Sequence, residues 1–274
     1  MKKGKVYLIG AGPGDPDLIT LKAVKALQHS DIVLADRLVS PKILEDHFSG
    51  EVIFVGKECR RGASTPQSSI NEMMTEYALA GKNVSRLKGG DASIFSNILD
   101  ELQVLKEHSI TYEIIPGITA VLGAASYSGI PLTARGYSTA VRIMTFYKHD
   151  IVHQDHWKDL AKTNDTLVFY MSVATLPELI EKLKNENISS SKKIAVIEQA
   201  TTPLQRVHTC SFEEYETSLK NKNFVSPSLV IIGKVVGLHE EFTWLQNDQS
   251  QDQYFAPVEN LNTYLTYKSV ENAV

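Results

Sequence analysis

Two glycine-rich turns, each of which ends in an aspartate, have the residue types and the spacing that best indicate a ligand-binding site. The first turn is Gly10-Ala11-Gly12-Pro13-Gly14-Asp15, which lies between an apolar run and a helical pattern. A turn that binds dinucleotide phosphates has the spacing G-x-G-x-x-G and directs free backbone amides at the phosphate. Here the spacing is G-x-G-x-G, Pro13 lacks an amide donor, and Asp15 would repel a phosphate. A tight strand-to-helix turn explains the glycines alone, but the proline and the acid favour a positively charged ligand without phosphates.

The second turn has the same character. Arg86-Leu87-Lys88 leads into Gly89-Gly90-Asp91 at the predicted carboxyl end of a strand. Ligands of open α/β sheets bind at these strand ends, and paired glycines let backbone carbonyls approach a ligand closely. A single Gly-Gly-Asp sequence is more often a surface turn. Two acidic turns that both follow strands favour a ligand-binding role over a surface turn.

Metal and disulfide chemistry have weaker support in the sequence. His149, His153 and His156 have the i, i+4, i+7 spacing that could present three imidazoles to zinc on one helical face. Their segment reads as a polar connection, however, and exposed histidines are the commoner outcome, so we predict no metal. Cys59 and Cys210 lie far apart in dissimilar contexts, which indicates neither a disulfide framework nor a CxxC site.

The elements that must position these turns alternate between strand and helix. Apolar runs of strand length occupy residues 6–9, 32–35, 52–55, 83–87 and 112–115. Helical spacing of apolar residues lies between them, and this alternation predicts an α/β fold with a largely parallel N-terminal sheet. Further strands are predicted at 141–147, 166–171, 194–199, 206–210 and 228–233, with helices at 176–184 and 212–219.

We therefore expect two α/β domains, residues 1–134 and 135–245, followed by a tail at 246–274. The first part of the tail is rich in Gln, Asn and Asp and has few apolar residues to bury. This composition predicts a mobile or loosely packed segment with at most a short terminal helix.

Composition and charge set the class of protein. The chain has 274 residues, of which 43% are hydrophobic and 22% charged, as in soluble globular proteins. Its formal net charge of −4 gives no reason to expect a nucleic acid or an anionic membrane as partner. The apolar run after the basic N-terminus is too short for a signal peptide, and no stretch is long enough to span a membrane. With two cysteines and no disulfide pattern, we expect a soluble cytoplasmic protein.

Several segments together resemble the tetrapyrrole methylase family. They include VYLIGAGPGDPDLITLKA at 6–23, RLKGGDASIFS at 86–96, IIPGITAVLGAASYSGIPLTAR at 114–135 and SPSLVIIGKVV at 226–236. The resemblance runs in order from about residue 5 to residue 245. Within the family, the GAGPGDP and GIPLT segments favour the members that methylate uroporphyrinogen III.

This resemblance implies an S-adenosylmethionine-dependent C-methyltransferase that forms precorrin-2 from uroporphyrinogen III through precorrin-1, on the way to sirohaem or cobalamin. It also implies a homodimer of two-domain subunits, with the cofactor in a cleft between the domains, S-adenosylhomocysteine as the spent cofactor, and no metal. Two alternatives stay open: a sister methylase acting on a later corrinoid precursor, and a tetrapyrrole-binding or regulatory protein with poor turnover. Pro13 and Asp15 disfavour a nicotinamide dehydrogenase.

The resemblance also assigns roles to residues. The positions that match cofactor contacts in the family are Pro13, Gly89, Gly90, Asp91, Ile94, Thr119, Ala120, Met171 and Ala200. Asp36 and Lys57 match the proton acceptor and the proton donor. Arg37 and Arg135 match basic positions associated with the substrate, whose carboxylates call for such side chains.

The sequence departs from the family pattern at two places. Ala200 stands where the family usually has glycine. In the segment 92–101, Asn97 replaces the arginine implicated in substrate handling, and Asp100 replaces the first glutamate. The cofactor part of the second turn is thus kept while the substrate part is altered, which leaves the proton acceptor and the substrate open.

Overall fold

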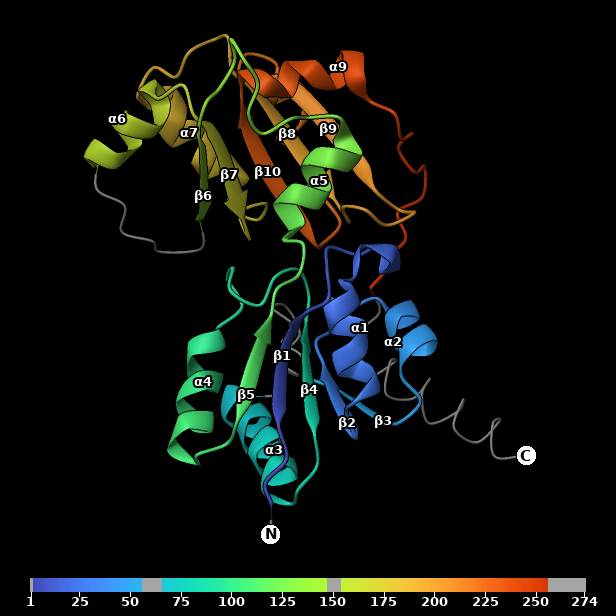
Figure 1. Cartoon of the computed structure of the whole chain (residues 1–274). Helices are drawn as coiled ribbons and strands as arrows, with labels where there is room; N and C mark the ends of the chain where they lie inside the picture. Colours follow the sequence, from blue (N-terminus) through green and yellow to red (C-terminus); the bar gives the residue numbers. More distant parts are fainter. Residues whose placement is uncertain (1, 56–65, 147–153, 256–274) are drawn as a thin grey trace. The chain divides into compact units, whose positions relative to one another are not determined.

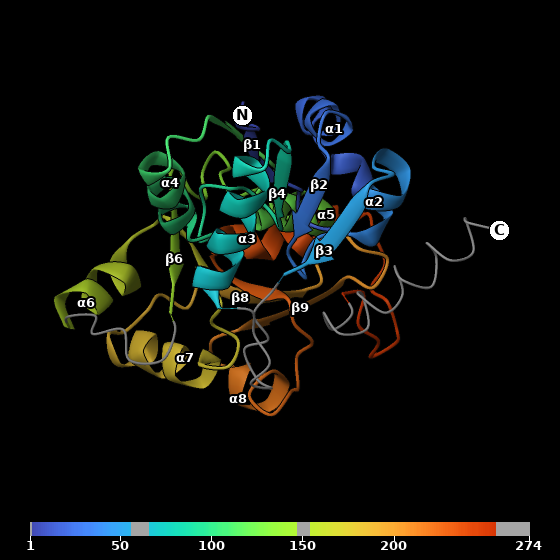
Figure 2. The same cartoon turned by 90° about the horizontal axis from the view of Figure 1, so that it is seen from below.

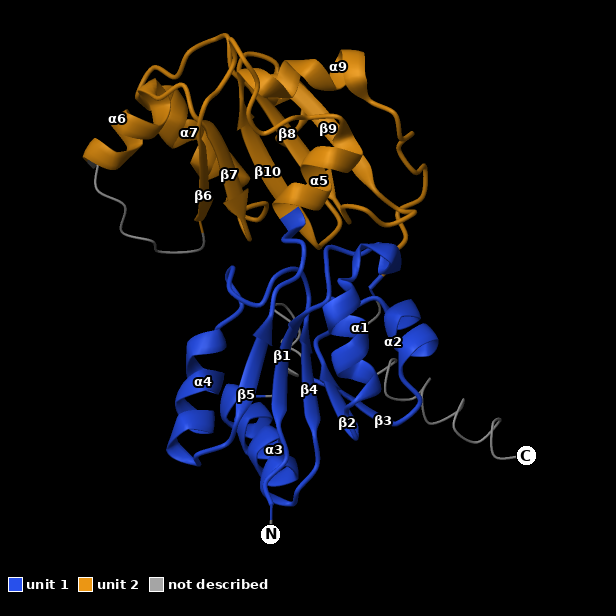
Figure 3. Cartoon of the chain, viewed as in Figure 1, with its two compact units in different colours: residues 1–120, 255–274 blue, residues 121–254 orange. Residues whose placement is uncertain are grey.

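The structure is a computed structural model in which residues 2–55, 66–146 and 154–255 are described (Figure 1). The chain divides into two compact units (Figure 3). Unit 1 comprises residues 1–120 and 255–274, and unit 2 comprises residues 121–254. The division falls at residue 120, whereas the sequence placed it at 134, so most of the Ala-rich helix and the loop after it belong to unit 2.

Unit 1 is built on a five-stranded sheet in which every pairing is parallel. Its strands are β1 (Val6–Gly10), β2 (Ile32–Ala35), β3 (Glu51–Phe54), β4 (Val84–Lys88) and β5 (Tyr112–Ile115). Their order across the sheet is β3-β2-β4-β1-β5, so β4 returns between β2 and β1. All of these strands lie where the apolar runs predicted them, and the expected parallel sheet is confirmed.

Helices cover both faces of this sheet (Figures 1 and 2). They are the α-helices α1 (Leu21–Gln28), α2 (Pro41–His47), α3 (Gln67–Leu79) and α4 (Ile98–Glu107), and a short 3-10 helix, η1 (Pro16–Leu18), lies between β1 and α1 in the chain. Apolar side chains of α1 and α2 pack with Ile9 and Val33 on one face. Those of α3 and α4 pack with Leu8 and Leu34 on the other. Neighbouring residues of β1 and β2 thus enter opposite cores, which is why both strands are apolar throughout.

Unit 2 contains a mixed five-stranded sheet with the order β6-β7-β10-β8-β9. Its strands are β6 (Val141–Thr145), β7 (Thr166–Tyr170), β8 (Lys193–Glu198), β9 (Arg206–Ser211) and β10 (Ser228–Gly233). Among the described strands of this sheet, β6 and β7 form the one parallel pair, and the other pairs are antiparallel. The helices are α5 (Ala120–Ser128), α6 (Gln154–Lys162), α7 (Leu176–Asn185), α8 (Tyr215–Ser218), η2 (Lys234–Leu238) and α9 (His239–Phe242). One core cluster joins α6, α7 and α8 to the sheet through side chains such as Trp157, Leu179 and Tyr215.

The sequence patterns predict neither α2 nor α6. Helix α2 is seven residues long and begins at Pro41, whose fixed φ suits the first helical turn. Helix α6 lies in the segment that reads as a polar connection, yet Trp157, Leu160 and Ala161 are at most 5% exposed. These three side chains form the narrow apolar stripe of an otherwise polar helix. Trp157 packs edge-on against Phe146, with ring centroids 5.2 Å apart.

The first part of the expected loose tail is hydrogen-bonded to unit 2. The side chain of Asn247 accepts from Val207 N at 2.7 Å and donates to Val207 O at 2.9 Å. Gln199 Nε2 donates to Asp252 O at 2.9 Å, and Gln199 Oε1 accepts from Tyr254 N at 2.7 Å. Polar side chains of unit 2 thus hold parts of this segment up to Tyr254 through hydrogen bonds to backbone, although its residues are exposed or half-buried. Residues 256–274 lie outside the described residues.

Candidate functional site

The carboxyl edge of the unit 1 sheet brings the two glycine turns together. Because the strands are parallel, the loops that follow β1, β2, β4 and β5 all leave the sheet at one edge (Figure 1). Ala11 N donates to Lys88 O at 2.8 Å. Gly12 and Gly90 donate to each other's carbonyls, with N–O distances of 3.0 and 2.7 Å. The two turns that the sequence singles out are thus bonded to each other along their backbones.

Glycine is required where the loop after β5 meets these turns. A Cβ atom on Gly10 would lie 2.6 Å from Gly117 N and 2.7 Å from Gly90 O. A Cβ atom on Gly117 would lie 2.4 Å from Gly90 O and 2.6 Å from Gly10 O. These neighbours are backbone atoms, which cannot turn aside as a side chain does, so alanine does not fit at either position. Three loops therefore meet at a junction formed by main-chain atoms.

Asp91 fixes the second turn to the loop after β5. Its Oδ1 accepts from the amide and the hydroxyl of Ser93, and its Oδ2 accepts from Gly117 N at 3.0 Å. Burial alone would raise the pKa of Asp91, but the hydrogen bonds from Ser93, Gly117 and Ala92 outweigh it and hold the pKa below its usual value. The carboxylate is therefore charged at neutral pH, and both of its oxygens brace the loops.

The other cofactor positions predicted in unit 1 lie in the same loops. Pro13 is buried in the first turn, and Thr119 and Ala120 are half-buried where α5 begins. Ile94, just after the second turn, is 36% exposed. Lys57 lies outside the described residues, so the structure does not place the expected proton donor.

The altered segment 92–101 has a strained backbone and an apolar surface. Phe95 and Asn97 have φ angles of 51° and 56°, in the left-handed region that non-glycine residues seldom adopt. Phe95 and Leu99 expose 45% and 63% of their surface. Strain of this kind clusters at ligand-binding segments, and here it lies directly beside the second turn.

The two cofactor positions predicted in unit 2 also lie in strained loops after strands. Met171 follows β7, has a φ of 55° and is 54% exposed. Ala200 follows β8 and lies between Gln199 and Thr201, whose φ angles are 46° and 68°. Each such conformation costs about 1–3 kcal/mol. Surrounding hydrogen bonds maintain it, including one from Thr201 N to Gln205 Oε1 at 2.8 Å.

Asp36 belongs to a charged network that the sequence analysis did not predict. Its Oδ1 accepts a hydrogen bond from Arg86 Nη2. The same guanidinium donates from Nε to Glu101 Oε1 at 3.0 Å, and Lys88 Nζ donates to that oxygen at 2.7 Å. The side chains of Arg86, Lys88 and Glu101 are 3%, 2% and 0% exposed, whereas Asp36 is 29% exposed. Two cations thus balance two carboxylates. Of these four side chains, that of Asp36 is the one that reaches the surface.

The pKa values of the two bases reflect this balance. Burial alone would lower the pKa of Arg86, but Asp36 and Glu101 outweigh it and raise the pKa above its usual value. For Lys88, burial and the neighbouring Arg86 outweigh the attraction of the carboxylates and hold the pKa below its usual value. Glu101 Oε2 has no hydrogen-bond partner in the described part of the chain. The hydrogen bonds that Oε1 accepts must therefore offset the cost of burying the carboxylate by themselves.

The two arginines assigned to the substrate are accessible. Arg37 is half-buried, and its Nη1 donates to Phe255 O at 3.5 Å. Arg135 is exposed in a turn that an Ala134 N to Ser138 O hydrogen bond of 3.0 Å closes. Within the described ranges neither guanidinium forms an ion pair, so both can receive a carboxylate.

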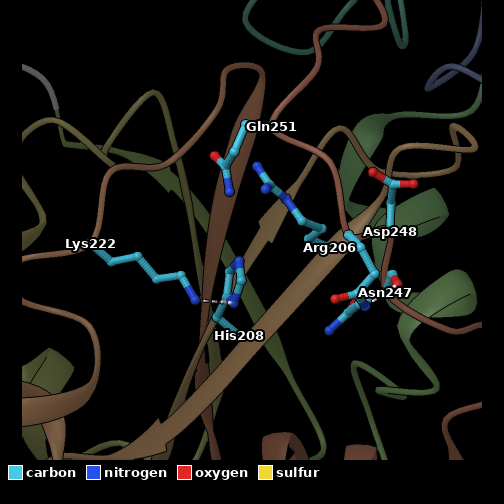
Figure 4. A pocket seen from close by; sticks show the side chains of 7 residues that line it. Arg206, His208, Lys222, Asn247, Asp248 and Gln251 are labelled. Atoms are coloured by element: carbon cyan, nitrogen blue, oxygen red, sulfur yellow. Dashed lines mark hydrogen bonds between the residues drawn. The ribbon is translucent and has the colours of Figure 1, made fainter.

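A polar pocket on unit 2 was not predicted. It has a volume of about 300 Å³ and is lined by Arg206, His208, Lys222, Asn247, Asp248, Gln249 and Gln251 (Figure 4). Glu198 Oε2 lies 2.9 Å from Arg206 Nε and 2.8 Å from His208 Nε2, and Lys222 Nζ lies 3.0 Å from His208 Nδ1. Glu198 pairs with Arg206, and Asp248 is a carboxylate in the lining itself, so the pocket does not indicate an anion site.

The alternative metal site can be compared with the structure only in part. His156 is exposed on α6, and His149 and His153 lie outside the described residues. Over residues 2–55, 66–146 and 154–255, no three His, Cys, Asp or Glu side chains are grouped so that they could hold a metal ion. In the same ranges, no helix has the length and apolar character that crossing a membrane requires.

A parallel sheet covered on both faces, acidic glycine turns at its carboxyl edge and a second mixed-sheet unit define a two-unit α/β protein, and the glycine turns meet at a junction of main-chain atoms. The family model of the tetrapyrrole (corrin/porphyrin) methylases matches residues 5–216. The chain belongs to this family. The resemblance, the fold class and the enzyme class expected from the sequence, a methyltransferase, are thereby confirmed.

Curated relatives of this chain are siroheme synthases. That of Saccharophagus degradans is 45% identical over 244 residues, which are 89% of this chain and 53% of the relative. That of Pseudomonas putida (strain W619) is 43% identical over 251 residues, which are 91% of this chain and 54% of the relative. The chain therefore spans about half the length of the curated relatives it matches.

Solved structures of two enzymes resemble the whole fold. Uroporphyrin-III-C-methyltransferase from Thermus thermophilus is 33% identical, with a TM-score of 0.73, and the match covers 90% of this chain and 99% of that one. The structure of that enzyme complexed with S-adenyl homocysteine has a TM-score of 0.71 at 33% identity and covers 86% and 100% of the two chains. A cobalamin biosynthetic enzyme, cobalt precorrin-4 methyltransferase, is 27% identical with a TM-score of 0.74, covering 85% and 95%.

Proposed function

We propose that the chain transfers methyl groups from S-adenosylmethionine to uroporphyrinogen III and forms precorrin-2 through precorrin-1, for sirohaem or cobalamin synthesis. The observation that carries this proposal is the main-chain junction at the carboxyl edge of the unit 1 sheet, where two acidic glycine turns meet. The likeness to the Thermus thermophilus enzyme complexed with S-adenyl homocysteine supports it. A cytoplasmic homodimer stays a prediction from the sequence.

The residues of the two turns fit S-adenosylmethionine better than they fit a dinucleotide. Asp15 and Asp91 place negative charge beside the junction, which attracts a sulfonium cation and repels a pyrophosphate. The cofactor supplies the methyl group, whose transfer needs no Lewis acid, so we propose no metal. The proposed contacts are Pro13, Gly89, Gly90, Asp91, Ile94, Thr119, Ala120, Met171 and Ala200.

The remaining tasks fall to charged side chains and to the loops. Methyl transfer is an in-line displacement, so the protein mainly aligns the reacting atoms and excludes water. Asp36 is proposed to accept the proton that leaves the macrocycle, because its carboxylate follows β2 and is partly exposed. Arg37 and Arg135 are proposed to bind substrate carboxylates through charge-assisted hydrogen bonds. Lys57 is proposed as the proton donor on the family resemblance alone.

Incubation with uroporphyrinogen III and labelled S-adenosylmethionine tests the reaction. We expect a product one methyl group heavier, then one two methyl groups heavier, by mass spectrometry, with activity unchanged by a chelator. Methylation of a later corrinoid precursor instead would favour the sister methylase, which the altered segment 92–101 and the likeness to cobalt precorrin-4 methyltransferase support. Binding of both ligands without any product would favour the binding protein.

Gly117→Ala tests whether the junction binds the cofactor. We expect S-adenosylhomocysteine, but not NAD, to raise the melting temperature of the wild type. In the variant the new Cβ would lie 2.4 Å from Gly90 O, so the loops must separate. Overpacking of this kind costs about 1–3 kcal/mol, and the affinity for S-adenosylhomocysteine should fall about 10- to 100-fold.

Gly233→Ala is the matched control for this experiment. A Cβ atom there would lie no closer than 3.5 Å to its neighbours, so the thermal shift should match that of the wild type. A full shift in Gly117→Ala would place the cofactor site away from the junction.

A further inference from the structure

Arg86 lies at the centre of the charged network, in the third position of β4. Its Nη1 donates to Leu34 O at 3.3 Å and to Leu87 O at 3.2 Å. Its Nε binds Glu101 and its Nη2 binds Asp36, so every nitrogen of the guanidinium makes a hydrogen bond. The side chain cannot rotate without losing several of these bonds at once.

Stability does not explain why this network is buried. Taking charged groups out of water often costs more free energy than their mutual attraction returns. What the network provides is orientation, because Glu101 and two carbonyls hold the guanidinium and leave one nitrogen for Asp36. Among the described residues, nothing hydrogen-bonds the second carboxylate oxygen of Asp36, whose side chain is 29% exposed.

We propose that Arg86, anchored by Glu101, is a positioning residue that holds the Asp36 carboxylate with its second oxygen free to meet the substrate. This inference rests on the proposed function, in which Asp36 accepts a proton. The proton moves from the macrocycle to Asp36, the electron pair of the broken bond stays on the macrocycle, and Arg86 keeps all of its protons. Arginine suits the position because its planar fork reaches several acceptors, which the single nitrogen of lysine does not.

Arg86→Lys tests the proposal, because it keeps the positive charge and removes the fork. We expect kcat to fall about 10- to 100-fold, while the KM for S-adenosylmethionine and the affinity for S-adenosylhomocysteine change by less than about twofold. In an Asp36→Asn background the same substitution should cost no further activity, because no base is left to position. Equal losses in both backgrounds would overturn the proposal.

Arg142→Lys is the matched control. Arg142 also pairs with two carboxylates, those of Asp159 and Asp165, but on unit 2. We expect its kcat to equal that of the wild type. A fall as large as that of Arg86→Lys would mean that loss of any doubly paired arginine slows the enzyme, which would also overturn the proposal.

A crystal structure of the Arg86→Lys protein tests the orientation of the Asp36 carboxylate without an activity assay. We expect the Asp36 carboxylate to have turned from its wild-type direction, and an unchanged direction would contradict the inference. If that variant does not fold, Glu101→Gln, which weakens the anchor of Arg86, takes the same tests. A wild type that methylates no tetrapyrrole refutes the proposed function, whereas an active wild type with an unaltered kcat in Arg86→Lys refutes this inference alone.

Discussion

The Asp36→Asn protein is expected to turn over about 100- to 10,000-fold more slowly than the wild type, which is the range that a positioned general base contributes. Asparagine keeps the shape of the side chain and can still accept from Arg86, but it does not take up a proton at neutral pH. Binding of S-adenosylhomocysteine should stay within about twofold of the wild type, because the change removes basicity alone. Rates with labelled S-adenosylmethionine, at saturating cofactor and substrate, measure the effect.

Asp46→Asn is the control for this experiment. Asp46 is a carboxylate of the same unit, on α2, that pairs with Lys42 at the surface. Its removal should leave turnover unchanged. If Asp36→Asn also turned over at the wild-type rate, Asp36 would have no part in the mechanism, and the base would have to be sought in the altered segment 92–101.

Glu101→Leu is expected to lower the free energy of unfolding by about 3–5 kcal/mol, which is the usual cost of removing one partner from a buried ion pair. Arg86 would keep Asp36 as a counter-charge, but Lys88 would lose the carboxylate that its ammonium contacts at 2.7 Å. At about 2–4 °C for each kcal/mol, the melting temperature should fall by roughly 10 °C. Urea unfolding and thermal melts, both followed by circular dichroism, give the two quantities.

Two further substitutions in α4 separate the loss of charge from the change of side chain. Glu107→Leu, at the exposed end of the helix, should change stability by less than about 0.5 kcal/mol. Glu101→Gln keeps the side-chain volume and one hydrogen-bond acceptor. Its loss of stability should therefore lie between those of Glu107→Leu and Glu101→Leu. Equal stability of Glu101→Leu and the wild type would show that the bases do not depend on Glu101.

Much of the fold could be predicted from the sequence because the strands are buried on both faces. The run Val6–Ile9 sends neighbouring side chains into opposite cores, so every position is apolar and the strand stands out. Helix α6 could not be found in this way, since few of its side chains are buried. The segment after residue 246 is fixed by Gln199 and Asn247 through hydrogen bonds to backbone, which composition does not reveal.

The site could be predicted where glycines mark close backbone contacts, and not where charges are buried. Arg86 and Lys88 alternate within a strand that is otherwise apolar or small, which signals that both need a buried partner. Glu101 has helical spacing with the apolar Ile98 and Leu105, so it could have been recognised as that partner. The pairing itself does not follow from the sequence, because an ion pair between a strand and a helix depends on which strand lies beside which helix.

The junction of Gly10, Gly90 and Gly117 also determines how much of the chain must be synthesised before the proposed binding surface can form. Gly10 ends β1, Gly90 and Gly117 follow β4 and β5, and β5 is the last strand of the unit 1 sheet along the chain. A nascent chain that has not yet released β5 and Gly117 from the ribosome lacks the third wall of the junction. A ligand bound there therefore stabilises chains in which the five-stranded sheet is complete, because it binds the folded junction and not a chain that lacks the third wall.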